Sequence, residues 1–153
     1  MSWLELKVPP PAVALLFGFV MWLGSSLVAP VEVSFGLRVG VAVVLACVGL
    51  AVGLAGIVSF RRANTTINPT KPMATSSLVT SGAFRFTRNP MYLSLLLYLL
   101  AWTVYLSNVF ALVFVPLFVL YITQFQIKPE ERALSSLFGS EYAAYKGRVR
   151  RWL

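Results

Sequence analysis

The chain has 153 residues, of which 58% are hydrophobic and only 12% are charged, and its mean hydropathy is +0.79. A soluble domain carries about 25% charged residues, so this composition excludes an ordinary soluble protein. Histidine and aspartate do not occur in the sequence. A histidine general base, a Ser-His-Asp triad and a histidine-ligated metal site are therefore excluded, and we expect no metal.

Two apolar runs occupy the first 60 residues. The run at 11–29 is longer than the apolar core of a signal peptide, which has about 7–15 residues, so we interpret it as a retained helix that Pro30 ends. The run at 37–60 contains GxxxG pairs, which allow two helices to approach closely in lipid. We expect it to pack against the first run rather than to form a dimer interface.

A polar loop at 61–89 separates these runs from a long uncharged stretch. That stretch is too long for a single helix that crosses a bilayer, and Ser107-Asn108 in its middle is a turn signal. The sequence therefore predicts a tight helical hairpin with spans at 90–106 and 109–127.

The segment 129–151 changes its pattern, because its apolar residues fall at steps of three or four and its basic residues lie between them. This pattern predicts an amphipathic helix, which Gly139 weakens in the middle. The whole chain, 1–153, then forms a single membrane domain of the all-α class. It has about four transmembrane helices, followed by the amphipathic helix on the cytoplasmic side.

The charge distribution predicts the orientation. The 13 basic residues outnumber the 5 acidic ones, and most lie in the polar loop and the final segment. Because cytoplasmic loops of membrane proteins are rich in Lys and Arg, we expect loop 61–88 and the C-terminus to be cytoplasmic in a multi-pass protein of the inner membrane. The net charge of +8 favours contact with anionic lipid over nucleic acid.

Three groups of polar residues gather on this same face. The first is the segment 77–92, the second includes Gln126 at the end of the hairpin, and the third is Glu130-Glu131. The hairpin returns the second and third groups to the side of the first. Polar groups near a bilayer are costly unless they are paired or used, so the sequence predicts a polar pocket at the inner interface.

Each polar residue also has a simpler interpretation when it is taken alone. Arg88 can serve as a topology charge, and the glutamate pair can complement a helix dipole. Tyr92 can be an interfacial aromatic residue, and Pro90 can be a proline that begins a helix. It is their combination that favours a functional site.

A family resemblance adds to this pattern. The chain resembles the isoprenylcysteine carboxyl methyltransferase and phospholipid methyltransferase superfamily, particularly its small bacterial members, over about residues 60–151. The matching residues are Leu78-Val79-Thr80, Gly82, Phe84, Arg88-Asn89-Pro90 and Tyr92, then Glu130-Glu131, then Phe138-Gly139, Glu141-Tyr142 and Tyr145.

The resemblance implies a membrane enzyme that transfers a methyl group from S-adenosylmethionine to a lipophilic small molecule or lipid. Carried over by position, it assigns Arg88 and Glu131 as catalytic candidates and Gln126 as a substrate contact. The residues that it assigns to the cofactor are Ser77, Leu78, Val79, Phe84, Asn89, Pro90, Tyr92 and Glu130.

Two positions depart from the family pattern. Asn89 stands where histidine is usual, and an asparagine can bind a cofactor but cannot relay a proton. Gln126 stands where the eukaryotic isoprenylcysteine enzymes have a substrate-contacting arginine, which argues against a prenylcysteine carboxylate. A lipid amine, a small hydrophobic acid, an isoprenoid and a thiol all stay open as acceptors.

The chemistry of methyl transfer suits a chain with few ionisable residues. The reaction is an in-line displacement at a carbon that the cofactor already activates, so the protein mainly binds and aligns. A carboxylate acceptor needs no base, whereas an amine or hydroxyl would need Glu130 or Glu131. We expect the acceptor to enter from the bilayer between the hairpin and the span at 37–60.

Two other functions are consistent with the sequence. Membrane reductases of the sterol type share a similar C-terminal region and use NADPH, although their chains are normally longer. A non-enzymatic polytopic membrane protein could carry the same polar residues as an interfacial anchor. Binding of S-adenosylmethionine separates the methyltransferase from both.

Overall fold

The computed structural model describes residues 5–63 and 76–153, and these residues form helices and connecting segments with no strand among them. Residues 64–75 of the predicted polar loop lie outside the described residues. The helices are α1 (Pro10–Ser25), α2 (Phe35–Arg62), the 3-10 turn η2 (Gly82–Arg85), α3 (Pro90–Leu106), α4 (Val109–Ile122), the π-helical turn η3 (Thr123–Ile127) and α5 (Lys128–Arg148).

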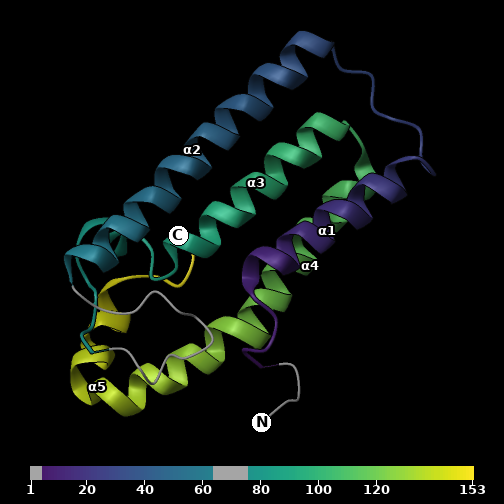
Figure 1. Ribbon diagram of the computed structural model, residues 1–153. Helices are drawn as coiled ribbons and strands as arrows, with labels where there is room; N and C mark the ends of the chain where they lie inside the picture. Colours follow the sequence, from purple (N-terminus) through teal and green to yellow (C-terminus); the bar gives the residue numbers. More distant parts are fainter. Residues whose placement is uncertain (1–4, 64–75) are drawn as a thin grey trace.

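The four long apolar helices α1 to α4 form a bundle, and α5 lies across one end of it (Figure 1). Helix α2 packs mainly on α3, whereas α1 packs on α3 and α4. The expectation that the run at 37–60 packs against the first run was therefore wrong. The GxxxG pattern indicated a close approach, but it carries no information about which helix approaches.

Glycines on α2 explain why α3 is its partner. A Cβ atom added to Gly53 would lie 2.7 Å from Ser94 Oγ, and one added to Gly56 would lie 3.2 Å from side-chain atoms of Pro90 and Met91. Ser94 Oγ also donates a hydrogen bond of 2.7 Å to the carbonyl oxygen of Gly49. The missing side chains let the two backbones meet, as is typical of helix contacts in membranes.

The turn predicted at Ser107-Asn108 is present between α3 and α4. Ser107 adopts the left-handed conformation with φ of 50°, and Asn108 Oδ1 accepts a hydrogen bond of 2.8 Å from the amide of Phe110, which caps α4. Both side chains also donate to carbonyls of the segment between α1 and α2, namely those of Val28 and Val31. The turn therefore holds the far end of the bundle together.

Helix α1 ends at Ser25, earlier than the expected bound of 29. The hydroxyl groups of Ser25 and Ser26 donate hydrogen bonds to the carbonyls of Trp22 and Leu23, at 2.7 and 2.6 Å. These side-chain hydrogen bonds satisfy carbonyl groups of the last helical turn and compete with the backbone hydrogen bonds that would extend the helix toward Pro30.

The chain continues from α4 through η3 into α5 without a loop. The π-helical turn at Thr123–Ile127 shifts the register, which rotates the residues that follow. Helix α5 is bent at Gly139, whose φ of 46° and ψ of −117° lie in a region that other residues rarely adopt. The interruption predicted at this glycine is thus a kink that separates two helical segments.

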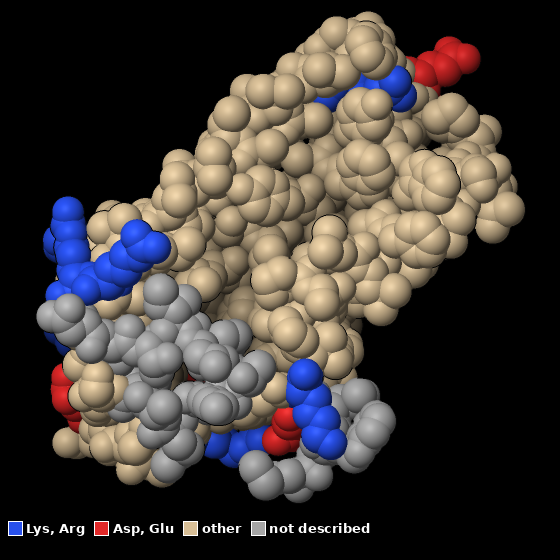
Figure 2. All heavy atoms as spheres, viewed as in Figure 1, with Lys and Arg blue, Asp and Glu red and all other residues tan. Residues whose placement is uncertain are grey.

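Two helical stretches are long and apolar enough to cross a membrane, namely Phe35–Arg62 and Val109–Arg148, the latter comprising α4, η3 and α5. Helices α1 and α3 are also apolar but shorter. Figure 2 shows that, on the face in view, the charged side chains gather toward the two ends of the molecule and the middle between them carries none. These features indicate association with a membrane.

Candidate active site

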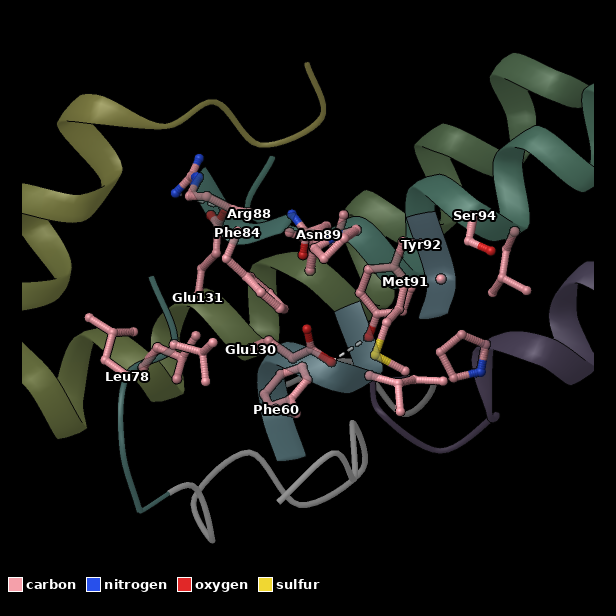
Figure 3. Close-up of a pocket in the computed structure, with 18 of the residues that line it drawn as sticks. Phe60, Leu78, Phe84, Arg88, Asn89, Met91, Tyr92, Ser94, Glu130 and Glu131 are labelled. Carbon is pink, nitrogen blue, oxygen red and sulfur yellow. Dashed lines mark hydrogen bonds and ion pairs between the residues drawn. The ribbon is translucent and has the colours of Figure 1, made fainter. Parts of the chain in front are cut away.

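A cavity of about 640 Å³ lies at the end of the bundle where α5 crosses it. Its walls come from the start of α1, the second half of α2, the segment before α3, the first turns of α3 and helix α5. Figure 3 shows how the residues from these separate elements point toward one space. Cavities of about 300–1,000 Å³ are typical of sites for small organic molecules.

Ten of the eleven residues singled out by the sequence line this cavity. They are Ser77, Leu78, Val79, Phe84, Arg88, Asn89, Pro90, Tyr92, Glu130 and Glu131. Gln126 does not line it; it is fully buried, and its Nε2 donates a hydrogen bond of 2.8 Å to the carbonyl oxygen of Val8. The fold thus brings together segments that lie about 40 residues apart in the chain, while their roles stay predictions.

Glu130 and Tyr92 form the polar centre of the cavity. The hydroxyl group of Tyr92, on the first turn of α3, donates a hydrogen bond to Glu130 Oε1 (Figure 3). Glu130 lies beyond the apolar stretch of α4, and burial raises the pKa of its carboxyl from 4.5 to about 8. The nearby Glu131 also raises this pKa, whereas the hydrogen bond from Tyr92 lowers it.

This pKa predicts how the stability of the ligand-free protein depends on pH. The folded protein holds the Glu130 proton more tightly than the unfolded chain does, so the stabilisation is complete below pH 4.5 and is lost as the pH rises toward about 8. The loss is at most about 1.4 kcal/mol per pH unit. Thermal unfolding between pH 5 and 9 should show the decline, and Glu130→Gln should flatten it. Identical pH profiles of the two proteins would contradict the prediction.

Glu131 is held by two arginines. Arg151 Nε and Nη2 donate to its two carboxylate oxygens at 2.9 and 2.7 Å, and Arg88 Nη1 lies 3.3 Å from Oε1. These contacts join α5 to the start of α3 and to the segment after α5. Both carboxylate oxygens of Glu131 are therefore occupied by guanidinium groups, and this geometry favours a positioning role.

The segment 149–152, called here the tail clasp, forms hydrogen bonds with the residues directly before α3. The carbonyl oxygen of Arg151 accepts a hydrogen bond of 2.8 Å from Asn89 Nδ2 and one of 3.2 Å from Thr87 Oγ1. The carbonyl oxygen of Arg150 accepts another, of 3.0 Å, from the amide of Arg88. The Nδ2 group of Asn89 thus donates to the backbone of the tail clasp, a role that an amide fills as well as an imidazole N–H.

Aromatic residues hold the segment before α3 in place. Burial raises the pKa of Tyr145, so its hydroxyl group stays protonated and donates a hydrogen bond of 2.7 Å to the carbonyl oxygen of Phe84. The ring of Phe84 packs edge-to-face on Phe60 of α2, with centroids 5.1 Å apart. Ser77 Oγ donates to the carbonyl oxygen of Ala63 at 3.1 Å. Both ends of this wall are therefore anchored.

Sequence reasoning missed part of the cavity wall. Pro9, Pro10 and Pro11 line it from the start of α1, and Ile57 lines it from α2. The tail clasp was also missed as a structural element. The basic residues of the tail clasp have the same sequence pattern whether they face lipid or bind a carboxylate. For the wall at the start of α1, the three consecutive prolines were a sequence signal of a rigid segment.

The expected entry path for an acceptor, between the hairpin and the span at 37–60, stays a prediction. Helices α2 and α3 meet at Gly49, Gly53 and Gly56. The cavity lies beside this contact, because α2, the first turns of α3 and the start of α1 all contribute to its lining.

These features define a helical, membrane-associated protein with a cavity that is apolar along its walls and polar at Glu130, Tyr92 and Arg88. The phospholipid methyltransferase family model matches residues 37–141, which is more than half of the chain. The chain therefore belongs to the phospholipid methyltransferase family, as the sequence resemblance predicted. The family implies a methyltransferase.

One curated relative is similar over a shorter region. An uncharacterized protein of Haemophilus influenzae (strain ATCC 51907 / DSM 11121 / KW20 / Rd) is 60% identical over 63 residues. These residues are 41% of this chain and the whole length of that protein. No solved structure matches the chain.

Proposed function

We propose that the chain is a multi-pass integral membrane enzyme that transfers a methyl group from S-adenosylmethionine to a lipophilic small molecule or lipid. Family membership supports methyl transfer. The observation that carries the proposal is the meeting of the motif segment 77–92 with Glu130 around one cavity. Neither a non-enzymatic anchor nor a nicotinamide-dependent reductase accounts for the family match.

The residues of the cavity suit S-adenosylmethionine, which carries an aromatic base, cationic groups and a carboxylate. Phe60 and Phe84 offer aromatic surface, and Glu130 offers a carboxylate that has no ion pair among the described residues. Arg88 offers a guanidinium whose Nε makes no hydrogen bond to another described residue. The proposed cofactor residues are Ser77, Leu78, Val79, Phe84, Asn89, Pro90, Tyr92 and Glu130.

When bound, the cofactor supplies a methyl group on a sulfonium, which makes the carbon reactive toward a nucleophile. The chain then has three tasks. Glu130 faces the cationic part of the cofactor, and Tyr92 orients the Glu130 carboxylate through their hydrogen bond. Arg88 binds an anionic group of the cofactor or acceptor, and Glu131 fixes Arg88 in place.

The fate of a proton depends on the acceptor. An acceptor carboxylate or thiolate has no proton to lose. A protonated amine or a hydroxyl must lose one, and Glu130 is the carboxyl of the cavity that two arginines do not hold. With a pKa of about 8, Glu130 is mostly protonated in the ligand-free protein near neutral pH, so it can accept such a proton once the cationic cofactor has favoured its ionised form.

We further propose that α1 to α4 cross the inner membrane, with loop 61–88 and the end of the chain in the cytoplasm. The basic residues of these segments support this orientation. Helix α1 has 16 residues, or about 24 Å of helix, so the bilayer must thin or the flanking segments must enter its interface.

Calorimetric titration tests the proposal. S-adenosylmethionine, its demethylated product S-adenosylhomocysteine and NADPH would each be titrated into the detergent-purified protein. Binding of the first two but not of NADPH is expected, and transfer of a labelled methyl group to extracted lipid would follow. NADPH binding alone would favour a reductase, and a folded protein that binds none of the three would favour a non-enzymatic role.

A further inference from the structure

Residues 5–11, called here the N-terminal strap, cross the polar end of the bundle and end in the proline wall of the cavity. We propose that the strap selects the methyl acceptor by requiring hydrocarbon beside its reactive group, and that Gln126 is the positioning residue that holds the strap. The inference rests on the proposed methyltransferase function and assigns a substrate class to the same cavity.

The strap is anchored at three points on η3 and α5. The amide of Leu6 donates a hydrogen bond of 3.1 Å to the carbonyl oxygen of Phe125. Arg132 Nη2 lies 2.6 Å from Glu5 Oε2 in an ion pair. The third anchor is Gln126, whose side chain holds Val8 directly before the prolines. The strap therefore has a fixed position relative to the helix that carries Glu130.

Gln126 is suited to this role by its burial. It is 0% exposed, and the hydrogen bond of 2.8 Å from its Nε2 to the Val8 carbonyl is made inside the protein. A buried amide hydrogen bond is costly to lose, because both partners would be left without water. The family resemblance placed a substrate contact at this position, and the structure gives it an indirect route to the substrate through Val8.

The wall that the strap presents is rigid and apolar. Pro9, Pro10 and Pro11 have fixed φ angles and lack amide hydrogens, so they offer an apolar surface without backbone donors. Ile57 and Leu95 extend the same apolar lining. A hydroxyl or sugar group placed here would lose its hydrogen bonds to water without gaining new ones, whereas a hydrocarbon chain would not.

The strap and the polar residues of the cavity come from different parts of the chain. The family match covers residues 37–141, so it includes the polar residues from Ser77 to Glu131 and does not reach the strap. The proline wall therefore adds to the cavity a surface on which the family match gives no information.

Photochemical labelling tests the inference without knowledge of the acceptor. Hexadecylamine and palmitic acid that carry a diazirine near the polar head would be the probes, and the labelled peptides would be identified by mass spectrometry. Labelling within residues 5–11 is expected for both probes, and a 3-hydroxylated palmitic acid probe should label them at least fivefold less. Equal labelling by the hydroxylated probe, or labelling that misses the strap, would overturn the proposal.

The positioning role of Gln126 needs a variant that keeps its volume. Gln126→Met should reduce labelling of the strap at least fivefold while the Kd of S-adenosylhomocysteine changes less than twofold. The matched control is Gln124→Met, because Gln124 is exposed two residues away and its Oε1 accepts a hydrogen bond of 2.7 Å from Lys128 Nζ rather than holding the strap. The role of Gln126 would be overturned if Gln126→Met weakened strap labelling and S-adenosylhomocysteine binding equally, or if it changed neither.

A third variant keeps the test valid if Gln126→Met does not fold. Pro11→Ser changes the exposed end of the wall and adds a hydroxyl group. It should lower the ratio of strap labelling by the palmitic acid probe to strap labelling by its 3-hydroxylated form at least threefold. No change in this ratio would overturn the assignment of the wall. Failure of the wild type to bind S-adenosylhomocysteine would instead reject the proposed function, while strap labelling would still report on the wall.

Discussion

Glu130→Gln is expected to weaken the binding of S-adenosylmethionine at least tenfold, which corresponds to about 1.4 kcal/mol. Glutamine keeps the shape of the side chain and can still accept the hydrogen bond from Tyr92, but it removes the charge that would face a cationic ligand. The change therefore isolates the electrostatic part of the interaction. Burial of the Glu130 carboxyl removes it from much of the surrounding water, which strengthens such an attraction.

Calorimetry on purified wild type and variant measures this effect. Glu141→Gln is the matched control, because Glu141 lies exposed on the same helix and loses the same charge. The control should bind the cofactor as the wild type does. Affinity in Glu130→Gln within twofold of the wild type, in a protein that unfolds at the same temperature, would contradict a role for Glu130 in cofactor binding.

Arg151→Ala is expected to lower both the stability of the protein and its affinity for the cofactor. The variant loses the two-pronged contact with Glu131 and leaves that carboxylate with Arg88 alone, at 3.3 Å. The side chain of Arg151 is 35% exposed, so solvent screens the pair, and we expect a loss of about 1–2 kcal/mol rather than the full cost of a buried ion pair.

Thermal unfolding in detergent and cofactor titration check this expectation together. Arg148→Ala is the control, because Arg148 is exposed near the end of α5 and its loss changes the net charge equally. Arg151→Lys should recover only part of the loss, since an ammonium cannot form the two parallel bonds. If Arg151→Ala and Arg148→Ala unfolded at the same temperature, the tail clasp would not stabilise the site.

Local patterns in the sequence predicted the helices and the gathering of polar residues. The hairpin turn was predictable because Ser107 and Asn108 interrupt an apolar run and because both residues tolerate turn conformations. The convergence of Tyr92 and Glu130 followed from the hairpin, which returns the chain to the face it left. Such features depend on order along the chain, which sequence reports directly.

Helix partners and contacts between distant segments were not predictable in this way. The π-helical turn at Thr123–Ile127 has no clear sequence signature, yet it sets which side of the chain Gln126 and Glu130 face. The tail clasp depends on backbone carbonyls of Arg150 and Arg151, and every residue has such a carbonyl. Only the folded chain reveals which ones are used.

The close contact between α2 and α3 has a consequence for the size of the cavity. Gly53 and Gly56 allow the close approach of the two helices. Ile57 and Phe60, which follow these glycines on α2, form part of the cavity wall. A methyl group at Gly53 would lie 2.7 Å from Ser94 Oγ, and one at Gly56 would lie 3.2 Å from side-chain atoms of Pro90 and Met91, so either would require a shift next to the cavity. The dimensions of the site therefore depend on two residues that carry none of its polar chemistry.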